Sequence, residues 1–125
     1  SKTIDLLGPN RVAFKGHISA NQLEEFWNEI TILLSTSDIE SYGLAIREAI
    51  LRGKKCVAVT SVGARDAKEN FGEGITLANL NPGQIAQSIA DEIESNKSTL
   101  NLESVRNKQE IMNASYVSEL VNTWR

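Results

Sequence analysis

Short apolar runs rich in β-branched residues recur along the chain and predict its strands. Four such runs occupy residues 11–16, 30–35, 56–61 and 74–78. Continuous apolar runs of this length, bounded by polar residues, are typical of strands buried on both faces. β-branched side chains also favour the extended backbone of a strand. The pattern therefore predicts four strands in a covered sheet.

Stretches with helical periodicity lie between and after these runs. The predicted helices span residues 19–29, 42–53 and 81–95, and a last helix spans residues 104–125. Ser19 stands three residues before Gln22, which is the spacing of a capping box, and Gly53 is a favourable residue for a helix end. Pro82 suits the first turn of a helix, where its missing N–H costs nothing. The polar residues 94–105 predict a linker into the last helix.

The order of the elements is strand, helix, strand, helix, strand, loop, strand, helix. This alternation is typical of a parallel sheet with helices on both faces, because each crossover between parallel strands needs a long connection. Right-handed crossovers then give a doubly wound, Rossmann-like α/β fold. We expect four parallel strands, with Glu40 beyond the carboxyl end of one of them.

Composition and charge narrow the range of functions. A chain of 125 residues is expected to form one domain, and a net charge of −3 with scattered basic residues argues against nucleic acid as the partner. No apolar run is long enough to span a membrane and no signal peptide is visible, which predicts a cytoplasmic protein. The single histidine, His17, cannot build a metal site, and Cys56 in its apolar run is expected to be a buried small side chain.

The turn after the second predicted strand carries the most distinctive chemistry. In an open parallel sheet, ligands bind beyond the carboxyl ends of the strands. Gly43 lets a ligand approach the backbone closely, and the first N–H groups of the following helix have no partner within that helix. Such a helix N-terminus suits a phosphate or diphosphate. The turn at residues 35–43 is therefore predicted to bind an anion.

Glu40 lies in this turn, and a second glutamate, Glu48, lies in the helix predicted after it. Eight residues at helical rise separate them by about 12 Å. Glu48 shares a helical stripe with Leu44 and Leu51, so it is expected to face inward and to need donors such as ribose hydroxyls. Glu40 would meet a hexose in the same way. Two simpler interpretations stay open: Glu40 would only complement the helix dipole, and Glu48 would only pair with neighbours of Arg47 or with Arg52 at i+4.

An ordered set of motifs around these acids resembles a known family. The stretch STSDIESYGLAIREAILRGKKCVAVTSVGA at residues 35–64 resembles the core of the retaining GT-B glycosyltransferases of family 4. The shared features include the two glutamates, the Tyr42-Gly43-Leu44 turn, and the strand and SVGA turn that follow. The resemblance continues upstream through NRVAFKGHIS and downstream through GEGITLANLNPGQIAQSIADEI, so that it covers about residues 10–95.

The resemblance implies a donor-binding domain for a nucleotide-diphosphate sugar in residues 1–95, followed by a linker and C-terminal helix in residues 96–125. It places Glu48 at the ribose hydroxyls and Glu40, as the expected catalytic residue, beside the donor hexose. The other donor-binding positions it implies are Ser41, Tyr42, Gly43 and Leu44 at the diphosphate and Gly16 and His17 at the base. It implies no metal and no other cofactor, because helix dipoles and basic residues meet the diphosphate charge.

The sequence departs from the family pattern at several positions. Ser41 replaces the usual glycine after the first acid, and Ala64 replaces the second glycine of the later turn. In the family, an arginine and a lysine bind the diphosphate, and no segment of this sequence matches the one that carries them. Lys15 or Arg47 could substitute for them, although both are expected to be surface charges. We therefore expect a donor domain that is incomplete at its N-terminus, lacks the acceptor domain and is inactive by itself.

These features together predict the donor-binding part of a hexosyltransferase that moves a sugar from a nucleotide-diphosphate sugar to an acceptor hydroxyl with retention. The expected partners are that donor, a sugar, lipid or protein acceptor, and an N-terminal acceptor domain, but no nucleic acid. The alternative from another class is a non-catalytic glycosyltransferase-like domain that binds a sugar nucleotide or a protein. A sugar-nucleotide epimerase of the same architecture fits the acid pair poorly.

Overall fold

A parallel sheet of three strands lies at the centre of the part of the chain that the structure describes. In this computed structural model, residues 12–95 and 101–124 are described. The strands are, in the order in which they lie in the sheet, β1 (Ile32–Ser35), β2 (Lys55–Val59) and β3 (Ile75–Ala78). Both pairs are parallel, with Cys56 of β2 opposite Leu33 on one side and Ile75 on the other. The parallel sheet predicted from the sequence is confirmed.

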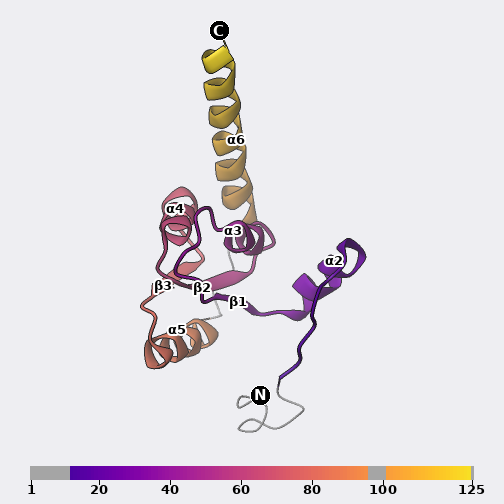
Figure 1. The fold of residues 1–125 in the computed structure, drawn as a ribbon, viewed down its shortest axis with the longest axis vertical. Helices are drawn as coiled ribbons and strands as arrows, with labels where there is room; N and C mark the ends of the chain where they lie inside the picture. The colour runs from indigo at the N-terminus through magenta and orange to yellow at the C-terminus, as the bar shows by residue number, and fades with distance from the viewer. Residues whose placement is uncertain (1–11, 96–100, 125) are drawn as a thin grey trace.

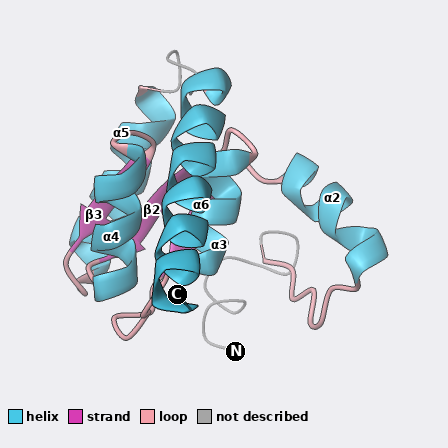
Figure 2. Cartoon of the chain, turned by 90° about the horizontal axis from the view of Figure 1, so that it is seen from above, coloured by secondary structure: helices cyan, strands magenta, loops and turns pink. Residues whose placement is uncertain are grey.

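Helices cover both faces of this sheet (Figure 1). Helices α3 (Leu44–Leu51) and α4 (Val62–Phe71) lie on one face, and α5 (Pro82–Glu94) lies on the other. Helix α6 (Leu102–Trp124) packs its first turns on α3 and α4 and then extends away from them, and α2 (Ala20–Glu29) leads into β1. Figure 2 shows α2 standing apart from the other helices. The arrangement is α/β and Rossmann-like, as expected.

The main core lies between the sheet and the helices α3, α4 and α6. Its buried members are Ile46, Ile50, Cys56, Ala58, Ala64, Ala67, Phe71, Ile75 and Val105. Cys56 and Ala58 alternate along β2 and face this cluster, while Val57 and Val59 are buried on the opposite face. The central strand therefore needs an apolar residue at every position, which explains its continuous apolar run.

The strand predicted at residues 11–16 is wrong for the residues that the structure describes. Residues 12–16 have no regular secondary structure, and Phe14 is 73% exposed. A strand needs a neighbour to satisfy its backbone N–H and C=O groups, and β1 lies at an edge of the described sheet with no partner beyond it. An apolar run favours a strand, but only pairing forms one.

The loop predicted between the third and fourth apolar runs is also wrong, because residues 62–71 form helix α4. The Ser61 side chain caps this helix by accepting a hydrogen bond from the Ala64 N–H at 3.1 Å. Ala64, Ala67 and Phe71 then recur at helical spacing and are fully buried. Small residues on the buried face made this stripe weak in the sequence, although its cap and spacing were present.

The last helix is confirmed, and it begins two residues earlier than predicted, at Leu102. Its first turns enter the core through Val105, and Met112 packs partly buried against the same cluster. Helix α5 ends at Glu94, and α6 takes up the last residues of the linker predicted at residues 94–105. Residues 96–100 of that predicted linker lie outside the described residues. Within the described chain, no helix combines the length and apolar character needed to cross a membrane.

Cys56 is fully buried, as predicted, and burial raises the pKa of its thiol to about 12. The unfolded chain ionises this thiol near its ordinary pKa of about 8.5, whereas the folded protein keeps it protonated. The contribution of the Cys56 thiol to the free energy of unfolding is therefore complete below a pH of about 8.5 and is lost as the pH rises toward 12. We expect the free energy of unfolding to fall by up to about 1.4 kcal/mol per pH unit above pH ~9, measured by urea titration. The same slope in Cys56→Ala would contradict this assignment.

Candidate functional site

The carboxyl ends of β1 and β2 each run into a turn and then a helix, and the two turns lie together at one edge of the sheet. The turn at residues 36–43 leads from β1 to α3, and a shorter turn leads from β2 to α4 through Ser61. Gly43 precedes α3 in the left-handed region, at φ 79° and ψ 47°, where other residues would be strained. Glu40 thus lies beyond the carboxyl end of β1, as predicted.

Two glycines let these turns touch backbone to backbone. The Gly63 N–H donates a hydrogen bond to the Glu40 carbonyl oxygen at 2.8 Å. A Cβ on Gly63 would stand 2.7 Å from the Gly43 nitrogen and 2.7 Å from the Tyr42 carbonyl carbon, which is too close for any side chain. The turn that carries Glu40 therefore rests directly on the start of α4.

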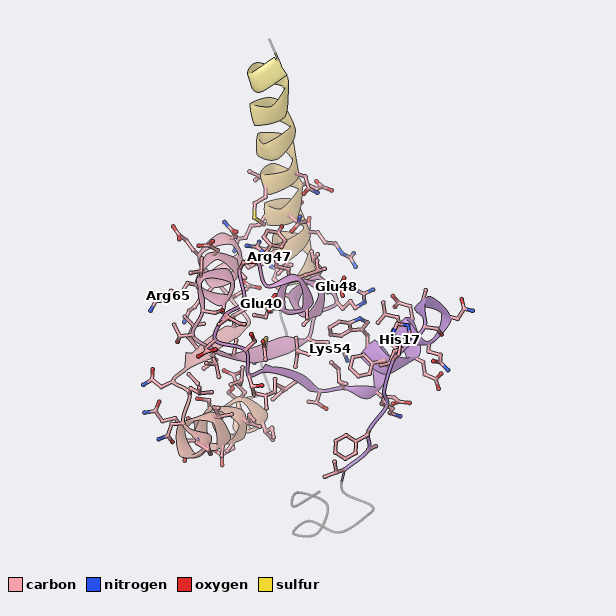
Figure 3. All side chains as sticks on the ribbon, viewed as in Figure 1. His17, Glu40, Arg47, Glu48, Lys54 and Arg65 are labelled. Carbon is pink, nitrogen blue, oxygen red and sulfur yellow. The ribbon has the colours of Figure 1, made fainter. Side chains whose placement is uncertain are left out.

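The N-terminus of α4 has its leading N–H groups occupied by the chain itself. The Gly63 N–H donates to the Glu40 main-chain carbonyl oxygen, and the Ala64 N–H donates to the Ser61 Oγ. The Arg65 N–H donates to the Ser61 carbonyl oxygen at 3.0 Å, and the Arg65 side chain points outward from α4 (Figure 3). Helix α4 is capped in this way and offers little to an anion.

The N-terminus of α3 is different, because its leading N–H groups are not used. The first helical hydrogen bond runs from the Arg47 N–H to the Gly43 carbonyl oxygen at 2.9 Å. The N–H groups of Leu44, Ala45 and Ile46 have no acceptor among the described residues. The first turn of α3 also carries no acidic side chain that would complement the helix dipole. These three N–H groups are free to donate hydrogen bonds at the place where the sequence predicts an anion site. Anion binding there stays a prediction.

Arg47 is buried, so its predicted place on the surface is wrong. Only 5% of the residue is exposed. Its Nε donates to the Tyr42 carbonyl oxygen at 3.1 Å, and its Nη2 donates to the Asn70 Oδ1 at 2.9 Å. Its Nη1 lies 3.9 Å from the Met112 Sδ. The guanidinium also lies over the Tyr42 ring, 4.2 Å from the centroid, and 6.0 Å from the centroid of Phe71.

Glu40 lies in the turn before α3, and Glu48 lies within α3. Both residues are half-buried, and Figure 3 shows Glu40 on the α4 side of the helix and Glu48 on the α2 side. Neither carboxylate forms an ion pair with a side chain that the structure describes. The structure therefore leaves both carboxylates able to accept hydrogen bonds from a ligand, and it does not pack them against each other.

The inward-facing stripe of α3 differs from the predicted one. Its buried positions include Ile46, Ala49 and Ile50, whereas Leu44 is 60% exposed. Glu48 lies at the margin of this buried face, which explains why it is half-buried. The alternative interpretation of Glu48 as a partner of Arg52 is not met: Arg52 donates to the Glu24 carboxylate on α2 at 2.8 Å and lies over the Trp27 ring.

The predicted donor-binding positions fall into two groups. Ser41, Tyr42 and Leu44 are exposed beside Gly43 at the carboxyl edge, so the structure brings these four together. Gly16 and His17 are exposed on the segment before α2, and Figure 3 shows His17 beside α2 rather than near Glu40. The structure does not bring them to the carboxyl edge, because residues 12–16 do not join the sheet. Their predicted role at the base stays a prediction.

Lys15 is a surface charge, as expected. It pairs with Glu29 of α2 at 3.6 Å, and both side chains are more than half exposed. A hollow of about 200 Å³ lies beside this pair, lined also by Ile18, Gln22 and Phe26. A shallower one of about 250 Å³ opens at the carboxyl end of β3, along the residues Leu77, Ala78, Asn79, Gln84, Gln87 and Ser88. Only the second shares an edge of the sheet with Glu40.

Two residues that shape this site were not identified as such from the sequence. Gly63 was seen only as part of a glycine turn, and the close contact with Gly43 depends on how two distant segments pack. Arg47 is one position before Glu48 in an apolar helix, and its enclosure by α4 and α6 was the missing information. No group of three or more potential metal ligands occurs among the described residues.

Comparison with protein families identifies a match for this chain. A family model described as glycosyl transferases group 1 matches residues 2–109, which is most of the chain and includes both glutamates and both turns. A search of curated proteins found no match.

Proposed function

The chain belongs to the group 1 glycosyltransferases, and from that premise we propose that it binds the donor, a nucleotide-diphosphate sugar, for transfer of the sugar to an acceptor hydroxyl with retention. Membership of the family supports glycosyl transfer in general. The observation that carries the finer proposal is the N-terminus of α3, whose free N–H groups lie at the carboxyl edge of the sheet between two unpaired carboxylates.

The diphosphate occupies the N-terminus of α3 in this proposal. The N–H groups of Leu44, Ala45 and Ile46 supply hydrogen-bond donors, and the dipole of α3 places partial positive charge at the same point. The missing side chain of Gly43 leaves room for the Gly63 carbonyl oxygen, which would stand 3.1 Å from a Cβ at Gly43, so it serves the contact between the two turns. Fixed donors of this kind stabilise the charge that grows on a departing diphosphate.

The two carboxylates hold the rest of the donor. Glu48, at the margin of the buried face of α3, accepts hydrogen bonds from the ribose hydroxyls. Glu40, in the turn before the helix, lies beside the hexose and acts on the sugar being transferred. With the diphosphate between them, Glu48 contacts the ribose and Glu40 contacts the hexose at the two ends of one donor molecule.

The reaction in this proposal needs no enzyme nucleophile. The bond between the anomeric carbon and the diphosphate oxygen breaks, and the acceptor oxygen bonds to the same carbon from the face that the diphosphate leaves. The acceptor proton passes to the departing diphosphate, so charge and atoms balance. The protein contributes by stabilising the charge of the leaving group and by positioning the two reactants. An N-terminal acceptor domain would supply the acceptor, which is a sugar, lipid or protein.

One observation favours the alternative, a non-catalytic domain that binds a sugar nucleotide. Neither of the two cations considered as grips for the diphosphate is free to reach it: Arg47 is buried with its donors engaged, and Lys15 pairs with Glu29. A site with free N–H groups but without either of these two cations would bind a diphosphate more weakly. Binding would then persist without efficient transfer.

The test is a panel of donors and nucleotides. UDP, GDP, ADP, dTDP and their glucose conjugates are titrated by calorimetry into the protein as it is naturally expressed, and sugar transfer is assayed for each donor. We expect one base to bind preferentially and its sugar conjugate to support transfer. Binding without transfer identifies the non-catalytic alternative, and no binding by any of the nucleotides contradicts both. The purified 125-residue chain is expected to bind weakly and to transfer nothing, and sugar transfer by that chain would refute this part of the proposal.

A further inference from the structure

We propose that Arg47 is a positioning residue for the donor diphosphate, which acts through Tyr42 without touching the donor. This inference rests on the proposed function, since it concerns the same turn. It assigns a role to the buried charge of Arg47, which neither the sequence pattern nor the proposed contacts with the nucleotide sugar explain.

The contacts of Arg47 hold the turn at Tyr42. Its Nε binds the Tyr42 carbonyl oxygen at 3.1 Å, and its guanidinium lies 4.2 Å from the centroid of the Tyr42 ring. Its Nη2 binds Asn70 at the end of α4, and its Nη1 faces Met112 of α6. One side chain therefore fastens the backbone and the ring of Tyr42 to two helices that are distant in sequence.

The peptide between Tyr42 and Gly43 transmits this contact. No described peptide bond is cis, so the C=O and N–H of this unit point in opposite directions. When Arg47 holds the Tyr42 carbonyl oxygen inward, it also fixes the direction of the Gly43 N–H and the entry of the chain into α3. The free N–H groups of Leu44 and Ala45 follow directly from that entry. A small rotation of this peptide would turn them away from the diphosphate.

The charge of Arg47 supports the same conclusion. Buried charges are normally paired, yet the hydrogen-bond acceptors around this guanidinium are a carbonyl oxygen and an amide oxygen. No carboxylate forms an ion pair with it among the described residues. A cation that contacts the start of α3 also lies at the positive end of the helix dipole, where it is disfavoured. An anion bound at this turn would relieve both unfavourable terms.

The experiment compares Arg47→Met and Arg47→Lys with a matched control, Arg52→Met. Arg52 belongs to the same segment, lies over the ring of Trp27 and binds Glu24, so its loss removes the same kinds of contact away from the turn. A further variant, Asn70→Ala, keeps Arg47 but removes its anchor on α4, and it changes an exposed residue that should not prevent folding. All proteins are assayed where circular dichroism shows them fully folded.

The readout is the affinity for the best-binding nucleoside diphosphate of the panel, divided by the affinity for the corresponding nucleoside. If the N–H groups at the start of α3 are misplaced, the protein loses affinity for the diphosphate group alone. Arg47→Met should therefore lower this ratio by about tenfold or more. Arg47→Lys should lower it by a similar factor, because a lysine keeps the charge but cannot make the forked contacts. Asn70→Ala should lower it by about twofold to threefold, since the Tyr42 contact remains. Arg52→Met should leave it unchanged.

The outcomes separate this inference from the proposed function. If the parent protein binds no nucleoside diphosphate, the proposed function fails and the inference with it. If the parent binds and the ratio is unchanged in Arg47→Met, only the inference is overturned, because loss of stability alone does not favour a nucleoside over its diphosphate. A ratio in Arg47→Lys equal to that of the parent would also overturn it, since charge without geometry would then suffice.

Discussion

Glu48→Gln should weaken binding of the donor nucleotide by about tenfold to a hundredfold, which is the value of hydrogen bonds to a charged group of about 1.5–3 kcal/mol. Glutamine keeps the shape of the side chain but loses the charge that ribose hydroxyls would contact. The loss should be the same for the free nucleoside diphosphate and for the nucleotide sugar, because both carry the ribose. Calorimetric titration of the protein as naturally expressed measures both.

Glu40→Gln provides the contrast within the same experiment. Glu40 would touch only the hexose, so the affinity for free nucleoside diphosphate should stay nearly unchanged while turnover of the sugar donor falls. Glu69→Gln, an exposed glutamate on α4, is the matched control and should change neither quantity. If Glu40→Gln and Glu48→Gln both leave binding and turnover at the level of Glu69→Gln, the proposed roles of the two acids are wrong.

Gly63→Ala should destabilise the fold and damage the site together. The added Cβ would stand 2.7 Å from the Gly43 nitrogen, and backbone atoms cannot move away as the tip of a flexible side chain can. We expect a loss of about 1–3 kcal/mol in the free energy of unfolding, as for other overpacking substitutions. The turn that carries Glu40 would have to shift, so the affinity for nucleoside diphosphate should fall as well.

Gly83→Ala is the matched control, because Gly83 is also the second residue of a capped helix. Its added Cβ would meet only the Asn81 Oδ1, at 3.2 Å, with no backbone atom nearby. We expect a change in unfolding free energy of less than about 1 kcal/mol and unaltered binding. Urea denaturation and calorimetric titration of both variants decide the matter. Equal stability of Gly63→Ala and Gly83→Ala would show that the two turns are not in close contact in solution.

The sequence predicted those parts of the fold that depend on continuous local patterns. The central strand β2 was found because it is apolar at every position, and α5 was found from its proline start and regular isoleucines. Helix α4 was missed because its buried face consists of glycine and alanine up to Phe71 in its last turn, and these small residues give little hydrophobic contrast. The strand predicted at residues 11–16 failed for the opposite reason. Its apolar pattern was adequate, but a strand also needs a partner, which no local pattern supplies.

The candidate site was predictable to a similar extent. The order of strand, turn, Gly43 and helix placed an anion-binding helix end at the carboxyl edge, and the structure has free N–H groups there. The surroundings of Arg47 were not predictable, because its partners Asn70 and Met112 lie 23 and 65 residues away in the sequence. The burial of Glu48 was overestimated, since the face of α3 that α4 and α6 cover is centred on Ile46 and Ile50.

The glycine contact between the two turns has a consequence for redesign by loop grafting. The backbone of residues 40–43 is held by a hydrogen bond from Gly63 and by a contact that only a glycine permits. A loop grafted from a relative in place of residues 40–43 alone would therefore pack against a second turn that does not match it. Transplanting the two turns as one block, from the end of β1 to the start of α3 and from the end of β2 to the start of α4, would preserve their mutual fit. Chimeras that exchange both turns should fold and bind nucleotide, whereas those that exchange either one should lose both properties.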